Sequence, residues 1–336
     1  MTELLEKLCN TDSISGDEKS VRDLIISQID GFCEWKIDNL GNIIAFKKGK
    51  KTPERKIMLD AHMDEVGLIV TNITPHGFLQ FTAVGGIDVS ALMFRNVKIN
   101  GKINGVISGK PIHLVDSEER KKLPEIDDLY IDIGAESKDE AEDYVSIGDS
   151  VCFDTKFYQK DNAILSKAID DRAGCAIIID IIRNFDEFDF YASFSVQEEV
   201  GLRGAKVSTY AINPDCAIAL ESTTAADIAD VPYEKQVCNV GKGPVVSFMD
   251  KATVYDKEFY NAAMKSGIPC QSKRAVAGGN NSGVIHLCRE GVRTVAISLP
   301  CRYIHSSSSV TSEEDYKNAK DLALYMLRGI ASGEIK

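Results

Sequence analysis

Five side chains spread over most of the chain have the types expected of metal ligands. Each lies at the end of an apolar run or at the start of a helical pattern; they are His62, Asp170, Glu199, Glu221 and His305. Imidazole and carboxylate ligands together suit Zn, Co or Mn. Glu198 stands directly beside one of the five, and a spare carboxylate next to a ligand is what metal-assisted hydrolysis needs.

His62 and Asp64 form a His-x-Asp pair after the apolar run 57–59. Residues two apart in an extended segment point the same way, so Asp64 could hold the imidazole in one tautomer while the other nitrogen binds metal. A buried histidine with a carboxylate partner and no metal has the same local pattern. The pair alone leaves both interpretations open.

Two pairs of adjacent carboxylates extend the pattern. Asp170 and Asp171 open a helical segment, where acidic residues can also be simple caps. Glu198 and Glu199 follow an apolar strand-like run, and a buried pair there is costly unless it is paired or metal-bound. A solvated turn is the alternative, but adjacent carboxylates can also divide metal binding and proton transfer between them.

The elements around these residues predict an α/β domain. Helical spacing predicts a helix over 21–29, with Ser15 and Glu18 as its capping box, and strands are expected at 34–38, 42–47 and 57–59. Further along, helices at 172–184, 257–266 and 313–331 alternate with strands at 190–196, 216–220 and 294–299. Such alternation implies a mostly parallel sheet in a three-layer αβα arrangement, with chemistry at the carboxyl ends of the strands.

The segment between these parts has a different character. From residue 68 to 158, short β-like pieces separated by glycines replace the helical periodicity, apart from a charged stretch at 138–143. We therefore expect a catalytic α/β domain at 1–67 plus 159–336, interrupted by a small all-β domain at 68–158.

Composition limits which binding partners and which cellular compartment we expect for this protein. The net charge is -12, which argues against nucleic acid or an anionic membrane as the main partner. The nine cysteines include no CxxC pair and read as buried thiols of a reducing compartment. No apolar run is long enough for a membrane span, and the first residues lack a signal-peptide pattern. We expect a cytoplasmic protein.

Four strings carry a resemblance to a known family: DAHMDEVG (60–67), AIDDRAG (168–174), QEEVGLRGA (197–205) and RYIHS (302–306). They resemble, in the same order, those of metallopeptidase family M42, the tetrahedral, deblocking and glutamyl aminopeptidases. The similarity runs nearly end to end and includes VGGID (84–88) and YIDIGA (130–135) in the insertion.

The resemblance implies a dinuclear aminopeptidase that acts on short peptides. Asp170 would bridge two divalent ions, most readily Zn, with Co or Mn as alternatives. His62 and Glu221 would complete one metal site, and Glu199 and His305 the other. The resemblance further implies Glu198 as general base for a metal-bridging water, Asp64 as the residue that orients His62, and a cis Asp170–Asp171 peptide. It also implies a homododecamer built from dimers, in which the insertion makes contacts.

Two positions depart from the family pattern. Glu221 stands where the family usually has Asp, and Asn281 stands where it usually has Asp after Gly-Gly-Thr or Gly-Gly-Ser. We expect altered substrate preference or weaker affinity at the Glu221 metal. Two alternatives remain: a glycosidase, as some family labels suggest although glycosidases generally need two opposed carboxylates and no metal, and a non-catalytic relative that binds metal or peptide.

Overall fold

A mixed sheet, whose four central strands are parallel and mostly buried, forms the centre of the larger lobe. The computed structural model describes residues 2–117 and 121–336. The sheet has eight strands in the spatial order β1 (Glu34–Ile37), β2 (Ile43–Lys47), β12 (Phe190–Ser195), β3 (Ile57–His62), β13 (Cys216–Thr224), β16 (Arg293–Cys301), β14 (Val245–Val246) and β15 (Gln271–Ser272). The four strands from β12 to β16 run parallel, whereas β1, β2 and β14 pair antiparallel with a neighbour. The prediction of a mostly parallel sheet is confirmed.

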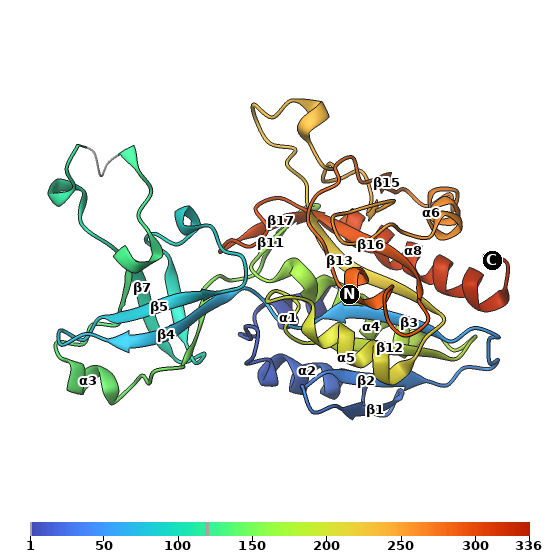
Figure 1. Cartoon of the computed structure of the whole chain (residues 1–336), viewed down its shortest axis with the longest axis horizontal. Helices are drawn as coiled ribbons and strands as arrows, with labels where there is room; N and C mark the ends of the chain where they lie inside the picture. Colours follow the sequence, from blue (N-terminus) through green and yellow to red (C-terminus); the bar gives the residue numbers. More distant parts are fainter. Residues whose placement is uncertain (1, 118–120) are drawn as a thin grey trace.

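Helices cover both faces of this sheet (Figure 1). They are α1 (Thr2–Cys9), α2 (Lys19–Ile29), α4 (Ile169–Asn184), α5 (Arg203–Ile212), α6 (Lys257–Met264), α7 (Ser282–Ile285) and α8 (Glu313–Ser332). Successive strand residues point to opposite faces, so Leu59 joins the main apolar cluster with α4 and α8, while its neighbour Met58 joins a second cluster with α5 and α7.

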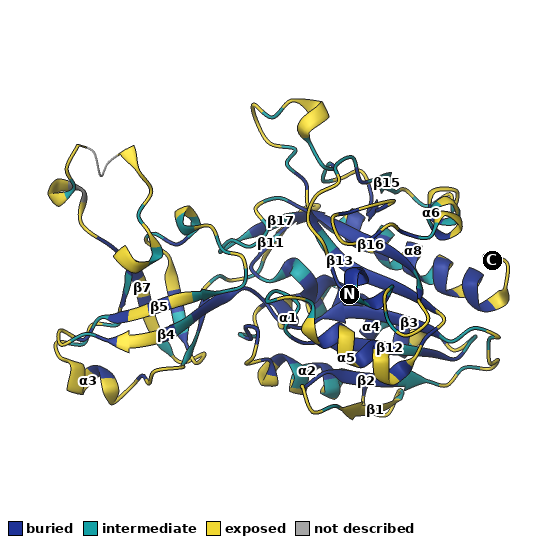
Figure 2. Ribbon diagram, viewed as in Figure 1, coloured by how far each residue is buried: buried dark blue, intermediate teal, exposed yellow. Residues whose placement is uncertain are grey.

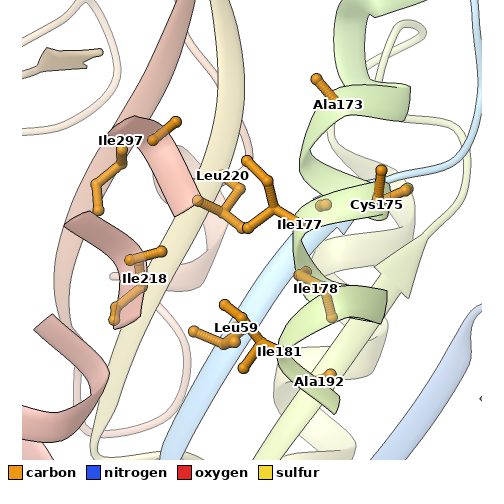
Figure 3. Packing of buried hydrophobic residues seen from close by; sticks show 14 of the residues in the cluster. Leu59, Ala173, Cys175, Ile177, Ile178, Ile181, Ala192, Ile218, Leu220 and Ile297 are labelled. Atoms are coloured by element: carbon orange, nitrogen blue, oxygen red, sulfur yellow. The ribbon is translucent and has the colours of Figure 1, made fainter. Parts of the chain in front are cut away.

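The main core lies between α4 and the middle of the sheet. Figure 3 shows Ile177, Ile178 and Ile181 of α4 close to Leu59 of β3 and Ile218 of β13. All five side chains are at most 2% exposed, so this contact removes a large apolar area from water. It fixes α4, and with it the residues at the amino end of α4, against the sheet.

A closed barrel forms the smaller lobe, at the left of Figure 1. Its strands, in spatial order, are β4 (Gly67–Ile73), β5 (Leu79–Val84), β8 (Tyr130–Asp132), β7 (Ile103–Ser108), β6 (Asn96–Ile99) and β9 (Ser150–Phe153). The barrel has an apolar core of its own, separate from that of the larger lobe. The lobe also carries α3 (Lys138–Glu142) and the short helices η1 (Val89–Ala91), η2 (Ile112–Leu114) and η4 (Ile126–Asp128).

A small sheet and a short helix lie outside the large sheet and the barrel. The strands β10 (Tyr158–Lys160), β11 (Ala163–Ser166) and β17 (Ser309–Ser312) form a small antiparallel sheet, and η5 (Tyr233–Lys235) lies in a loop after β13. Figure 2 shows the strands of the large sheet mostly buried and the outer loops exposed. Among the helices of the described residues, none has both the length and the apolar character needed to cross a membrane.

The structure corrects three local predictions. The Ser15–Glu18 capping box is wrong, because α2 has no side-chain cap and Ser15 instead donates its hydroxyl to Asp64 at 2.5 Å. Glu221 does not end its strand, since pairing with β16 continues β13 to Thr224. The helix α5 was not predicted; it begins after Leu202 in a left-handed conformation and lacks a side-chain cap, so its start has no capping signal.

Candidate metal centre

Parallel strand ends bring the predicted ligands together. His62 ends β3 and lies opposite Ser195, the last residue of β12, so the Glu198–Glu199 turn follows directly beside it. β13 pairs with the other side of β3 and carries Glu221 into the same edge of the sheet. His305 arrives in the loop after β16. The sheet order therefore gathers residues that are far apart in the chain.

Asp170 lies between the two histidines. Its Oδ1 is 3.3 Å from Nε2 of His62, and its Oδ2 is 3.4 Å from Nε2 of His305. A cis peptide joins Asp170 to Asp171, as the resemblance implied, and neither residue has helical backbone angles although they stand at the start of α4. Both carboxylate oxygens of Asp170 thus face an imidazole.

Glu198 and Glu221 lie near His62, whereas Glu199 lies near His305. Oε2 of Glu221 and Oε2 of Glu198 are both 3.9 Å from Nε2 of His62, while Oε2 of Glu199 is 3.3 Å from Nε2 of His305. All six predicted side chains therefore lie in one cluster. Two groups within this cluster have potential ligand atoms that all lie within 4.8 Å of one another: His62 with Glu198 and Glu221, and His62 with Asp170 and Glu199.

Asp64 acts through its backbone as well as its side chain. Its carbonyl lies 3.0 Å from Nδ1 of His62, and because a carbonyl can only accept, Nδ1 donates to it and Nε2 is the nitrogen that faces the cluster. The Asp64 carboxylate is farther from Nδ1, at 3.6 Å. It instead accepts hydrogen bonds from the backbone N–H groups of Glu198 and Glu199 at 3.0 and 3.1 Å. Asp64 thus holds both the histidine and the glutamate turn.

The protonation of the cluster reflects its burial and crowding. Burial, helped by the nearby charge of Asp170, raises the pKa of Glu199 to about 8, and burial likewise raises the pKa of Glu198 to about 7. Burial opposes a charge on His62, but Glu198 and Asp170 still raise its pKa well above the usual range. Burial also works against a charge on His305, yet its bond to Asp170 raises the pKa to about 9. These groups share protons that a divalent cation would replace.

The donor set fits divalent metal ions. Two ligand atoms bound to one tetrahedral ion at ~2.1 Å lie roughly 3.4 Å apart, and the separations of Asp170 from the two histidines are 3.3 and 3.4 Å. Nitrogen and carboxylate oxygen are ligands of Zn, Co and Mn. Four carboxylates gathered at two imidazoles are also a costly arrangement without compensating positive charge.

Asn281 fixes the side chain of Glu221 through a backbone hydrogen bond. Its backbone N–H donates to Oε1 of Glu221 at 3.1 Å, so the other oxygen of this glutamate is the one that faces His62. The Asn281 amide donates to Asp60 at 2.7 Å and to Ser195 at 2.9 Å. Asp60 is fully buried, and burial raises its pKa to about 6. A carboxylate is therefore present beside this position, supplied by Asp60 rather than by residue 281.

Sequence reasoning missed residues that surround the cluster. Gly85, at the exit of β5, lies so close that a Cβ there would be 3.2 Å from Cβ of Glu199 and 2.9 Å from Val66. Asp171 accepts a hydrogen bond from the backbone N–H of His62 at 3.3 Å. Lys273 lines the pocket that opens on the cluster. The glycine-rich string at 84–88 was noted without a role, and nothing local to Lys273 marked it.

Imidazoles and carboxylates gathered at the carboxyl edge of an α/β sheet, beside a pocket, have the composition expected of a site in a metal-dependent hydrolase. The chain belongs to the M42 glutamyl aminopeptidase family, whose sequence model matches residues 41–322. It is accordingly a peptide hydrolase of the aminopeptidase class, and the family implies divalent metal ions as its cofactor.

Relatives agree with this assignment over nearly the whole chain. A putative aminopeptidase of Acetivibrio thermocellus is 39% identical, covering 96% of this chain and 97% of its own. The lysyl aminopeptidase of Pyrococcus furiosus is 34% identical, with 97% and 96% covered. These coverages include the barrel, so the insertion is shared with the relatives.

Solved structures show the same fold. An aminopeptidase from the archaeon Desulfurococcus kamchatkensis superposes with a TM-score of 0.92 at 34% identity, covering 99% of this chain and 97% of that one. The TET1 peptidase of Pyrococcus horikoshii, which assembles into a tetrahedron or a large octahedral shell, gives a TM-score of 0.84 at 33% identity, with 97% and 98% covered. The mixed α/β fold with its small barrel is thus that of the TET aminopeptidases.

Proposed function

We propose that this protein is a dinuclear metal-dependent aminopeptidase that removes N-terminal residues from short peptides. One observation carries the proposal: the two oxygens of Asp170 face two different histidines, at 3.3 and 3.4 Å. Asp170 would hold both ions, with His62 and Glu221 completing one site and Glu199 and His305 the other. The domain that holds them has the three-layer αβα architecture of dinuclear exopeptidases, and Zn is the leading candidate, with Co and Mn as alternatives.

The divalent ions would supply an activated water and a polarised scissile carbonyl. Glu198 would take the proton from the attacking water and deliver it to the leaving amine. Its backbone N–H bond to Asp64 fixes the start of the glutamate turn, and its carboxylate lies 3.9 Å from Nε2 of His62, at the centre of the cluster. The side chain is 11% exposed, enough to meet a substrate but little enough to limit competing water.

The acidic cluster also favours a free amino terminus. Carboxylates of Glu198, Glu199 and Asp170 face the same pocket, so a protonated or metal-bound α-amine would be attracted there. Binding the terminus in this place would restrict cleavage to the first peptide bond.

The decisive experiment is hydrolysis of aminoacyl-p-nitroanilides and short peptides by the purified protein. We expect release of single residues from the amino end, loss of activity with a chelator, and recovery on adding Zn, Co or Mn. Failure to cleave any substrate with any metal would contradict the proposal and favour a role in binding metal or peptide. Chelator-resistant hydrolysis of sugar polymers would instead support a glycosidase.

The proposal extends to the organisation of the chain. Residues 1–67 plus 159–336 would form the catalytic domain, and residues 68–158 an inserted domain for oligomerisation and substrate access. By analogy with the TET1 peptidase, the chain would assemble into a homododecamer built from dimers, which would admit peptides and exclude folded proteins. All nine cysteines are free, which suits a reducing compartment such as the cytoplasm.

A further inference from the structure

Asn281 contacts three neighbouring strands that carry or precede the predicted metal ligands. Its side-chain amide donates to Oδ2 of Asp60 in β3 at 2.7 Å and to Oγ of Ser195 at the end of β12 at 2.9 Å. Its backbone N–H donates to Oε1 of Glu221 in β13 at 3.1 Å. Because β12, β3 and β13 are adjacent in the sheet, one residue bonded to all three can set the spacing of their ends.

The segment that carries Asn281 is itself held in place. The Asn281 carbonyl accepts the N–H of Ile285 at 3.1 Å, within the short helix α7. The side-chain oxygen of Asn280 accepts the N–H of Ser282 at 2.8 Å, and its amide donates to the hydroxyl of Tyr255 at 3.0 Å. Asn281 therefore approaches the strand ends from a segment that several hydrogen bonds fix.

The Asn281 side chain serves only as a donor. Asn281, Asp60 and Ser195 are 0% exposed, and among the described residues neither Oδ1 of Asn281 nor Oδ1 of Asp60 has a hydrogen-bond partner. An amide has two N–H hydrogens to donate, whereas an ionised carboxylate has none. A buried polar group that loses its partner keeps the full cost of its removal from water. Asp60 therefore needs a donor at residue 281.

We propose that Asn281 is a positioning residue matched to Asp60, and that this pair sets the metal affinity of the site that Glu221 completes. This role rests on the proposed dinuclear centre and adds to it two residues that bind no ion. Asn281 holds one oxygen of Glu221, while Oε2 of that glutamate faces Nε2 of His62. Asp60 lies two residues before His62 in β3, so its bond to Asn281 ties the strand of one ligand to the support of the other.

The other metal site should depend on this pair much less. Among the described residues, neither Asn281 nor Asp60 forms a hydrogen bond with Glu199 or His305. A change confined to the pair should therefore weaken one of the two sites and largely spare the other.

The test replaces the donor with an acceptor of nearly the same shape. Asn281→Asp keeps the backbone N–H but loses the side-chain donor, so the dissociation constant for Zn should rise by roughly 10–100-fold at one of the two sites. Calorimetric titration of the metal-free full chain with Zn measures both sites. The matched control is Asn261→Asp, which makes the same change at an exposed position of α6 and should leave both affinities unaltered.

Exchanging the two side chains separates positioning from a general loss of stability. In the double variant Asp60→Asn with Asn281→Asp, the amide donates from residue 60 to a carboxylate at residue 281, and the Ser195 hydroxyl can donate to the same carboxylate. The double variant should bind both Zn ions with affinities close to those of the unmodified chain. A double variant that binds Zn no more tightly than Asn281→Asp refutes the matched pair.

The remaining outcomes separate this role from the proposed function. Unchanged affinity at both sites in Asn281→Asp, or an equal loss at both, overturns the role of the pair and leaves the dinuclear centre intact. Binding of fewer than two Zn ions by the unmodified chain overturns the dinuclear centre, and the role of the pair falls with it. If Asn281→Asp does not fold, the double variant decides: it should fold and bind two Zn ions, and failure to do so refutes the proposal.

Discussion

At the scale of single residues, Asp64 links the parts of the cluster. Its carbonyl fixes one nitrogen of His62, and its carboxylate fixes the backbone of Glu198 and Glu199. Ser15 in turn donates to that carboxylate at 2.5 Å. Burial works against a charge on Asp64, but His62, followed by the bonds from Ser15 and the Glu198 N–H, outweighs it and keeps the pKa of Asp64 lowered. One buried residue thus sets the positions of three others.

The role of Glu198 can be tested by replacing its carboxylate with an amide. Glu198→Gln keeps the shape of the side chain but cannot accept a proton, so kcat should fall by roughly 10²–10⁴-fold. Metal content, measured by elemental analysis, should stay the same because other residues supply the main ligands.

The control for that substitution is Glu54→Gln, which makes the same change at an exposed site and should leave kcat unaltered. Full turnover by Glu198→Gln would remove the general-base assignment. Loss of metal along with activity would show that Glu198 is a ligand instead.

At the scale of elements, the exit of β5 brings the barrel against the larger lobe. Gly85 has φ +90°, and a Cβ there would press on Val66 at 2.9 Å and on Glu199 at 3.2 Å. Gly86 follows, and its Cβ would lie 3.6 Å from Nδ1 of His305. At residue 85 only glycine lets the chain pass so close to Val66 and Glu199, whereas the 3.6 Å separation at residue 86 is an ordinary contact. The inserted lobe therefore contributes to the shape of the site.

Gly85→Ala should reduce kcat/KM more than a control substitution that has a similar effect on the free energy of unfolding. The matched control is Gly134→Ala in the same lobe, where φ is +81° and no atom lies within 4 Å of the added Cβ. Both variants carry a similar backbone cost of roughly 1–2 kcal/mol, measured as a loss in denaturant unfolding. Because only Gly85→Ala displaces Glu199, its kcat/KM should fall on the order of tenfold further. Equal activity of the two variants would refute the contact's importance.

At the scale of the whole molecule, the barrel lobe carries large apolar side chains on its surface. Phe94 is 70% exposed, Leu123 66% and Ile147 66%. Such residues scattered singly need no partner, and in the proposed assembly we expect them to lie at contacts between copies.

If the chain forms the proposed homododecamer, light scattering should give a mass near twelve times that of the 36.8 kDa chain. A cage of that size should also cleave a short peptide while sparing the same N-terminal sequence on a folded protein. A stable monomer, or equal cleavage of both substrates, would contradict the assembly.

Much of the fold was predictable because it depends on local pattern. The strand β3 begins with a continuous apolar run and the helix α8 has a helical apolar spacing, and both signals are local to the segment. Their predicted bounds differ from the observed ones by at most three residues. α5 escaped prediction because its capping geometry is a left-handed Leu202 rather than a capping side chain. Ser15 was misassigned because its hydroxyl had a stronger acceptor in Asp64, 49 residues away in the chain.

The sequence by itself determined which residues could do chemistry, since a histidine or glutamate directly after a buried apolar run is placed toward the carboxyl edge of a sheet, as His62 and Glu221 are. Only the tertiary structure decided how they combine. The strand order β12-β3-β13-β16 places His62 between the Glu198–Glu199 turn and Glu221, and no local pattern encodes that order. The same holds for Lys273 and Gly85, whose proximity to the site arises from contacts between segments distant in the chain.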